Sequence, residues 1–330
     1  MTALTDGVLV FAVAPGRALA VVAGAAVAAG VGVAVARSLR ARPPAEGQWR
    51  RAGTLTELNM YPLKSCRPYP SDSLLATESG LRRGELRDRV FVAVDRDGSF
   101  VSARTHPLLV HVEVKATPED AAGADVRFEF HSPRVPEPLS LDLAKLTAAA
   151  AALRRIRVHG LAVSAVDCGD EAAAWLRKAV VNREIHGEAT AVADLRLAFY
   201  PREATDREKV PVLTAGTQGI YSDMTSYHVL TTASLAALNA KLAQPVSWRN
   251  FRPNFVVDGP AAFEEDAWTW LRVGDAVFKV EMPCGRCLLT TVNPDTAVKD
   301  PDCEPLKTLR RQVKYYWILF GPLFFVNGVY

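Results

Sequence analysis

Apolar residues recur in short runs from residue 52 onward, and turn residues separate these runs. Residues 90–104 and 268–282 each contain two apolar runs around a turn that includes Gly and Asp. Within 90–104, valines at alternate positions share one face of the first run. Alternation with a period of two around such a turn is typical of a β-hairpin, and the pattern predicts one in each stretch.

Helical periodicity is confined to fewer stretches. In residues 169–180 the apolar positions form one stripe, and acids near its start and bases near its end complement the helix dipole. Residues 232–243 predict a second helix, capped by Thr232 and ending before Pro245, and the alanine run 148–152 predicts a short one. Strands outnumber helices and do not alternate regularly with them. The pattern therefore predicts an α+β, mainly β fold rather than a doubly wound sheet.

The first fifty residues differ in composition from the rest. Residues 18–36 carry no charge and are rich in Gly and Ala, and their number is close to the ~20 residues that a helix needs to cross a membrane. Three arginines follow directly, whereas the preceding flank contains only Arg17 and also carries Asp6. By the positive-inside rule this predicts a single-pass signal anchor with the bulk of the protein in the cytosol. The N-terminus lacks the basic region of a cleaved leader.

Proline, glycine and charge predict the division of the chain into domains. A Pro-rich linker follows the apolar segment, so residues 1–50 form an anchor and linker. The charged, aperiodic stretch 201–211 predicts a connection between two domains at 51–200 and 201–330. A second apolar stretch, 315–326, is too short to span a membrane and is split by a Gly-Pro pair, which predicts strand, turn and strand.

Charge and motif content disfavour several classes of protein. The 39 basic and 36 acidic residues give a net charge of +3, a balance too even for a nucleic-acid binder. No Gly-x-Gly-x-x-Gly or phosphate-loop motif occurs, so a nicotinamide or nucleotide domain is not expected in this chain. Five cysteines in 330 residues favour a reducing compartment over a disulfide scaffold.

Two of the cysteines, Cys284 and Cys287, flank Arg286 in one short stretch. A structural zinc site needs four ligands, but the other cysteines are scattered and the histidines show no paired spacing. A thioredoxin-like dithiol begins a helix, whereas this pair follows a strand-like segment. A single soft thiolate for a metal, favoured by the neighbouring arginine, and an inert buried cysteine remain as alternatives.

Basic and polar residues also stand at three predicted strand ends. Lys64 and Ser65 lie in "YPLKSC", Arg89 precedes an apolar run, and Arg252 and Asn254 lie in "WRNFRPNFVV". Each such residue taken singly is usually solvated surface. If they converge in space, they form an anion cradle suited to a phosphate.

Six segments in this order resemble the vertebrate mitochondrial amidoxime-reducing components, a family of MOSC-domain molybdenum enzymes. They are "YPLKSC", "LRDRVFVAVDRDGSFVSAR", "VDCGDEAAAWL", "NFRPNFVV", "CGRCLLTTVNPDT" and "EPLKTLRRQ", spread over residues 52 to 312. The six together are specific, whereas the Cys-Gly-Arg-Cys segment alone is not.

The resemblance implies a fold and a set of site residues. The fold is a MOSC N-terminal β-rich domain packed on a MOSC β-barrel. Cys287 matches the catalytic thiolate ligand to molybdenum, whereas Cys284 has no matched role. The positions that match contacts to the molybdopterin cofactor are Lys64, Ser65, Arg89, Asp223, Arg252, Asn254 and Arg286.

The resemblance also implies an activity and a place in the cell. The family reduces N-hydroxylated small molecules such as amidoximes, hydroxylamines and N-oxides, with electrons from NADH through cytochrome b5 reductase and cytochrome b5. It implies the mitochondrial outer membrane, with the folded part in the cytosol and the apolar segment in the bilayer. The alternatives are a membrane-tethered molybdopterin carrier, an inactive isoform, or a related MOSC activity in sulfur handling during cofactor maturation.

The chain departs from the family pattern near its end. The family's final barrel strand, with its Gly-Asp-Pro sequence, is not seen after Val326, and Leu323 stands where a cofactor-facing tyrosine is expected. The resemblance therefore leaves the closure of the barrel and one wall of the cofactor pocket open, while the matched metal ligand lies upstream.

Overall fold

The structure is a computed structural model, and it describes most of the chain. The described residues are 2–13, 43–118, 123, 125–182, 194–203, 205–208, 219–312 and 324–327. Outside them lie the predicted anchor at 18–36, Leu323, and parts of the stretches 201–211 and 315–326. No helix within the described part is both long enough and apolar enough to cross a bilayer.

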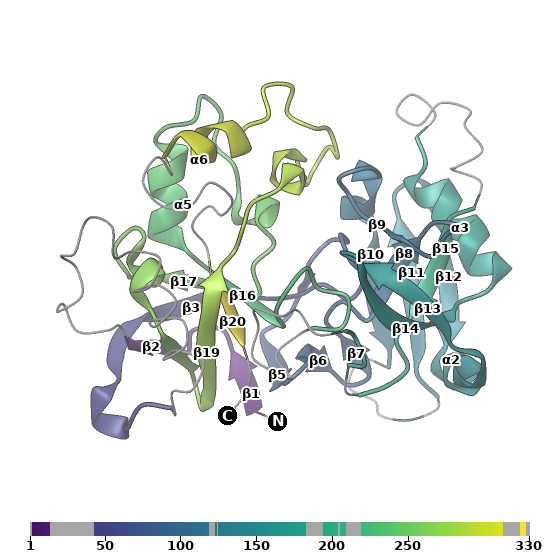
Figure 1. The fold of residues 1–330 in the computed structure, drawn as a ribbon, viewed down its shortest axis with the longest axis horizontal. Coiled ribbons are helices and arrows are strands. Elements are labelled where there is room, and N and C mark those ends of the chain that lie inside the picture. The colour runs from purple at the N-terminus through teal and green to yellow at the C-terminus, as the bar shows by residue number, and fades with distance from the viewer. Residues whose placement is uncertain are drawn as a thin grey trace.

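Seven strands of the described chain form a closed β-barrel, which occupies the left half of Figure 1. They are β2 (Leu9–Val13), β3 (Arg50–Met60), β16 (Tyr227–Thr231), β17 (Phe255–Asp258), β18 (Trp270–Val273), β19 (Ala276–Pro283) and β20 (Phe324–Asn327). Their order is β17-β16-β20-β19-β18-β2-β3, and β3 pairs back onto β17 to close the ring. Neighbours are antiparallel except β16 and β17, which run parallel and are connected through α5 (Thr232–Asn239). The two-residue strand β4 (Tyr69–Pro70) pairs antiparallel with the end of β3.

The N-terminal strand β2 completes the barrel. It pairs with β18 on one side and with β3 on the other. Its alternate residues Val10 and Ala12 are buried in the core, whereas Leu9 is 41% exposed. Before it, β1 (Thr2–Thr5) pairs with β5 (Ser73–Thr77) and buries Leu4. The departure from the family pattern near Val326 left open whether the barrel closes. In the structure, β2 closes it.

The pairing of β2 with β3 bears on the predicted membrane topology. The two strands are adjacent in one sheet, with Val10 opposite Gly53. The predicted anchor at 18–36 lies between the two strands in sequence and outside the described residues, so the single-pass topology stays a prediction.

Three smaller sheets accompany the barrel, and the strands from β8 onward in them fill the right half of Figure 1. Their orders are β1-β5-β6-β7, β10-β11-β12 and β13-β14-β15-β8-β9. The further strands are β6 (Gly80–Arg83), β7 (Leu86–Arg87), β8 (Phe91–Val94), β9 (Phe100–Val101), β10 (Glu113–Thr117), β11 (Arg127–Ser132), β12 (Val135–Asp142), β13 (Arg154–Val158), β14 (Leu161–Asp167) and β15 (Arg196–Phe199). The further helices are α2 (Leu143–Ala148), α3 (Asp170–Val180) and α6 (Leu306–Gln312).

The predicted elements are largely confirmed. The hairpins at 90–104 and 268–282 are the pairs β8–β9 and β18–β19, and the stripe at 169–180 is α3. The helix predicted at 232–243 is shorter, and its cap is Thr231, whose Oγ1 accepts from the backbone N–H of Ser234. The mainly β, α+β fold is as predicted.

An aromatic core fixes β8 and, through it, the segment that carries the site. The ring of Phe91 lies 5.0 to 5.2 Å from those of Phe128, Phe130 and Phe199. All of β8 is buried, so its alternating valines do not mark one buried face and one exposed face. The backbone of Phe91 in turn accepts the N–H of Lys64 at 2.9 Å. The core of the N-terminal part therefore holds a predicted site residue directly.

The role of β2 predicts different costs for two neighbouring substitutions. Val10→Asp places a carboxylate in the barrel interior without a partner and should lower the free energy of unfolding by about 3 kcal/mol. Leu9→Asp, at the half-exposed neighbouring position, should change it by less than about 1 kcal/mol. Urea denaturation of the two variants measures the difference. Equal effects would show that β2 does not close the barrel.

Candidate functional site

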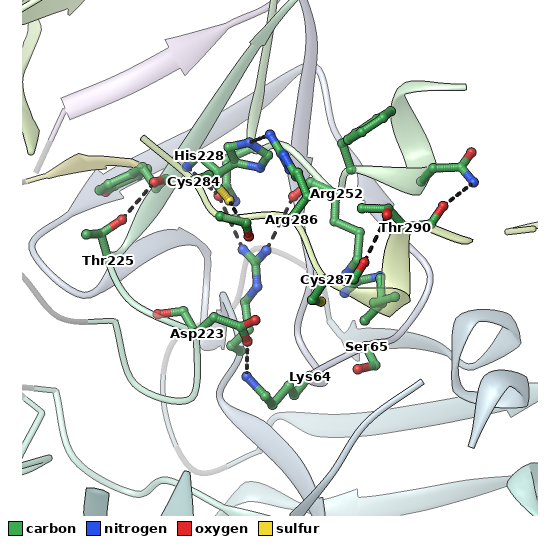
Figure 2. Close-up of a pocket in the computed structure, with 18 residues that line it drawn as sticks. Lys64, Ser65, Asp223, Thr225, His228, Arg252, Cys284, Arg286, Cys287 and Thr290 are labelled. Carbon is green, nitrogen blue, oxygen red and sulfur yellow. Dashed lines mark hydrogen bonds and ion pairs between the residues drawn. The ribbon is translucent and has the colours of Figure 1, made fainter. Parts of the chain in front are cut away.

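All eight predicted site residues line one pocket, shown in Figure 2. They come from five separate parts of the chain, and these parts meet between the barrel and the N-terminal sheets. The residues are Lys64, Ser65, Arg89, Asp223, Arg252, Asn254, Arg286 and Cys287. The residues that the family resemblance matched to one site therefore lie together. Their local sequence patterns alone gave no reason to expect this.

Three of these residues adopt a backbone conformation that side chains disfavour. The φ angles are 74° for Ser65, 46° for Arg89 and 58° for Arg252. Such left-handed conformations at residues other than glycine cost on the order of 1 to 3 kcal/mol each and gather at functional sites. Their concentration around one pocket indicates that the fold holds these side chains in place for binding rather than for stability.

The ring of Tyr61 supports two of the arginines. It is fully buried, and the guanidinium carbons of Arg89 and Arg252 lie 4.5 and 4.2 Å from its centroid. Its hydroxyl donates to the carbonyl of Pro253 at 3.1 Å, which fixes the ring. Cation–π contacts of this kind are stronger when water is excluded. Tyr61 thus orients both cations, a role that its place in the "YPLKSC" segment did not predict.

Arg89 is held by a buried polar network. It forms an ion pair with Asp88, and burial raises the pKa of that carboxyl although the Arg89 charge opposes the shift. Its Nη1 donates to Asn254 Oδ1 at 3.2 Å. The same oxygen accepts the backbone N–H of His228, and Asn254 Nδ2 donates to the carbonyl of Asn59. The side chain of Asn254 is therefore engaged on both ends and orients Arg89.

Two cationic side chains of the pocket carry buried N–H groups that no described residue accepts. They are Nη2 of Arg252 and Nε of Arg286. Arg252 uses its Nη1 to donate to the carbonyl of Cys66, so only part of its hydrogen-bonding capacity is met. An unpaired buried donor on a charged group is costly, and an anion in the pocket would relieve that cost. The wall of the pocket is thus built to accept negative charge.

Lys64 and Asp223 form an ion pair on another wall, at 2.5 Å. Lys64 is buried and also donates to the carbonyl of Tyr221 at 2.7 Å. Burial lowers the pKa of Lys64 to about 8, against the opposing effect of Asp223. For Asp223, burial raises the pKa, but the charge of Lys64 and a hydrogen bond from His159 outweigh it and hold it well below its usual range.

The two neighbouring cysteines have different surroundings. Cys287 is only partly buried and precedes the 3-10 turn Leu288–Thr291, where its carbonyl accepts from the backbone and hydroxyl of Thr290. Asn250 Nδ2 holds this turn by donating to the carbonyl of Thr290 at 3.1 Å. Cys284 is buried, and burial raises the pKa of its thiol to about 11. Both cysteines line the pocket, and Cys287 is the more exposed of the two.

The residues that line the pocket bear on the kinds of site that the cysteine pair left open. All five cysteines are free, and the described residues include no cluster of three or more His, Cys, Asp or Glu that could hold a metal ion. The pocket instead combines two cysteines, of which Cys287 is the more exposed, with buried cations. A thiolate suits a soft metal, and arginine and lysine suit phosphate, so the residues fit a molybdenum–molybdopterin cofactor.

Sequence reasoning missed several residues that hold the site. Arg207 lies in the stretch predicted as a charged connection, yet it is 5% exposed and donates to the carbonyls of Ser222 and Asp223. Its surroundings in sequence, rich in charge and without periodicity, gave no signal of burial. His228 and Asn250 were likewise unmarked, because their roles arise from contacts between segments distant in sequence.

Comparison with known proteins agrees with the two-part architecture. Residues 52–183 match the MOSC N-terminal beta barrel domain and residues 217–328 match the MOSC domain. The stretch 201–211, predicted as a connection, lies between the two matched regions.

Curated relatives extend this similarity over most of the chain. The mitochondrial amidoxime reducing component 2 of Bos taurus is 36% identical over 271 residues, which cover 82% of this chain and 75% of the bovine protein. The mitochondrial amidoxime-reducing component 1 of Mus musculus is 34% identical over 275 residues, covering 82% and 74%. The human component 1 is 34% identical over 273 residues, covering 78% and 71%.

The lowered pKa of Lys64 predicts that anion binding depends on pH. Sulfate remains a dianion from pH 6 to 10, so it probes the charge of the pocket of the cofactor-free protein. Protonated Lys64 attracts sulfate, and loss of its proton near pH 8 should weaken binding by up to about tenfold per pH unit above that value. Arg89, whose pKa is raised, stays charged over this range, and burial lowers the pKa of Arg207 to about 10, so the measurements extend to about pH 9. Isothermal titration calorimetry at several pH values measures the effect.

Lys64→Arg is the matched control for this experiment. Arginine keeps its charge up to pH 10, so the variant should bind sulfate with little change over the same range. A variant that loses affinity with the same midpoint as the native protein would show that another group controls the binding.

Proposed function

The chain belongs to the family of the mitochondrial amidoxime-reducing components, and from this premise we propose that it is a molybdenum-cofactor-dependent reductase of N-hydroxylated small molecules. The observation that carries the proposal is the pocket itself. Cys287, the more exposed of the two cysteines that line it, lies there with cations whose buried N–H groups have no partner in the described structure.

Each group of residues has a distinct task in this proposal. Cys287 is the thiolate ligand to the metal, since it is the more exposed of the two cysteines and burial raises the pKa of the Cys284 thiol. The cationic groups of Arg252, Arg286 and Lys64 bind the phosphate and polar edges of the pterin. Ser65, Arg89, Asn254 and Asp223 complete the cradle or hold its members in place.

The reaction is a two-electron reduction of an N–O bond. The N-hydroxylated compound takes up two electrons and two protons, the N–O bond breaks, and the oxygen leaves as water. When bound, the molybdenum cofactor supplies a centre that can change oxidation state and so pass two electrons to the substrate. The protein binds and orients the cofactor, and its buried cations keep the charge of the pocket positive.

The electrons must come from a separate protein. The sequence holds no flavin, nicotinamide or iron–sulfur motif with which to collect them from NADH. We propose that NADH-cytochrome b5 reductase and cytochrome b5 supply them in sequence. We also propose a location at the cytosolic face of the mitochondrial outer membrane, because its relatives are named mitochondrial components and because sharing one membrane surface raises the effective concentration of donor and acceptor.

Two cysteine substitutions test the proposal on the full chain. Cys287→Ala should lose bound molybdenum and at least about 90% of amidoxime reduction in a system reconstituted with cytochrome b5 and its reductase, because the metal loses its protein ligand. Cys284→Ala removes a thiol of the same size three residues away and should keep both properties. Metal content is measured by mass spectrometry and turnover by the amidine product.

Two outcomes would contradict the proposal in different ways. Equal loss of metal in the two variants would indicate a site that uses both cysteines. Native protein that holds molybdopterin tightly but reduces no N-hydroxylated compound would indicate a cofactor carrier rather than a reductase.

A further inference from the structure

A histidine that the family resemblance does not assign lies in the wall of the pocket. His228, in β16, is 5% exposed and contacts Arg286, with 3.0 Å between His228 Nε2 and Arg286 Nη2. In Figure 2 this pair and the pair of Lys64 and Asp223 lie on opposite sides, with Cys287 between them in the view. The imidazole therefore touches a residue that flanks the proposed metal ligand.

The contact fixes the protonation of the imidazole. A guanidinium N–H can only donate, so His228 Nε2 must carry its lone pair toward Arg286. The ring also forms a hydrogen bond with the backbone of Arg252. Since Nε2 is the acceptor, we assign the proton of the neutral ring to Nδ1. Burial, and the positive charge of Arg286, lower the pKa of His228 well below its usual value, so the ring stays neutral.

A neutral acceptor and a carboxylate would affect the charge of Arg286 differently. An Asp or Glu in this place would orient Arg286 but would also cancel its charge. An uncharged imidazole holds the guanidinium by one N–H and leaves its full positive charge for another anion. The face of the same guanidinium lies 5.0 Å from the ring of Phe251, and its Nε has no partner in the described chain.

The two arginines with unsatisfied N–H groups meet at this one imidazole. His228 accepts from the side chain of Arg286 and donates to the backbone of Arg252, the residue with a φ of 58°. Its own backbone N–H and carbonyl are both bonded to Asn254. Movement of the imidazole would therefore affect the guanidinium of Arg286 and the backbone of Arg252.

We propose that His228 is a positioning residue for anion binding: its neutral imidazole holds the guanidinium of Arg286 in the orientation that binds an anionic group of the ligand. The identity of that group as part of molybdopterin rests on the proposed function, whereas the hydrogen bond and its effect on anion binding do not.

Sulfate binding to the cofactor-free full chain tests the proposal without any requirement for activity. His228→Leu removes the acceptor at similar size and should weaken sulfate binding at pH 7 by about 10-fold or more, the range found when partners that orient a ligand-binding residue are removed. His228→Gln places a neutral carbonyl oxygen near the position of Nε2 and should bind sulfate within about threefold of the native protein. Calorimetry measures both, and thermal unfolding checks that both variants are folded.

A double substitution shows whether the histidine acts through Arg286. In an Arg286→Ala background, His228→Leu should cause no further loss of sulfate affinity, because nothing remains for the imidazole to orient. Additive losses would overturn the proposal and assign His228 a separate role. The content of molybdopterin per purified chain should follow the same order, with the native protein and His228→Gln above His228→Leu.

Nitrogen-15 NMR of the native protein provides a test that does not depend on any variant folding. The expected spectrum has a protonated Nδ1 and an unprotonated Nε2 for His228 from pH 6 to 8. An imidazolium, or a proton on Nε2, would overturn the proposal, as would native-like sulfate binding by His228→Leu. If sulfate binding follows the proposal but the protein holds no molybdenum, the proposed function fails and the positioning role stands.

Discussion

The stack of Arg89 and Arg252 on the ring of Tyr61 is the interaction on which the site depends. It connects the segments after β3 and before β17, which are neighbouring strands of the barrel, to the segment before β8, which belongs to another sheet. Two guanidinium groups so close would repel each other in a dry interior. The π-electrons of the ring, the carboxylate of Asp88 and the carbonyl acceptors around them offset this repulsion without filling the pocket.

The partners of the other cations in the pocket wall also leave the cavity free. Of the four lysine and arginine side chains that line the pocket in the described chain, two are held by neutral acceptors: Arg252 by the carbonyl of Cys66 and Arg286 by the imidazole of His228. Carboxylates occur only where a second role is visible, at Asp88 beneath the arginine pair and at Asp223, which joins Lys64 to His159. Neutral partners fix geometry and leave the electric field directed at the cavity, which is what an anionic cofactor requires.

Local patterns in the sequence predicted the hairpins and helices that depend on residues close together in the chain. Period-two alternation around Gly and Asp predicted the hairpin β18–β19, and the apolar stripe with its graded charges predicted α3. The site residues were predicted through the family resemblance of short motifs, since lysines and arginines at strand ends carry no such signal themselves. What escaped prediction depends on contacts distant in sequence. The burial of Arg207, the bond between His228 and Arg286, and the place of β2 in the barrel all require the partner segment to be known.

The insertion of β2 between β18 and β3 makes this a fold of high contact order. The hydroxyl of Thr269 donates to the carbonyl of Val13 across 256 residues of sequence. A ribosome releases the N-terminal strand long before β18 exists, so the barrel stays open during most of translation. In that interval β1 can already pair with β5, with Leu4 opposite Leu74, and β2 can pair with β3, so β2 is held in place before β18 is made. Closure is therefore a late event of folding, and the site matures only near the end of synthesis, when the segment that carries Cys287 follows β19 into place.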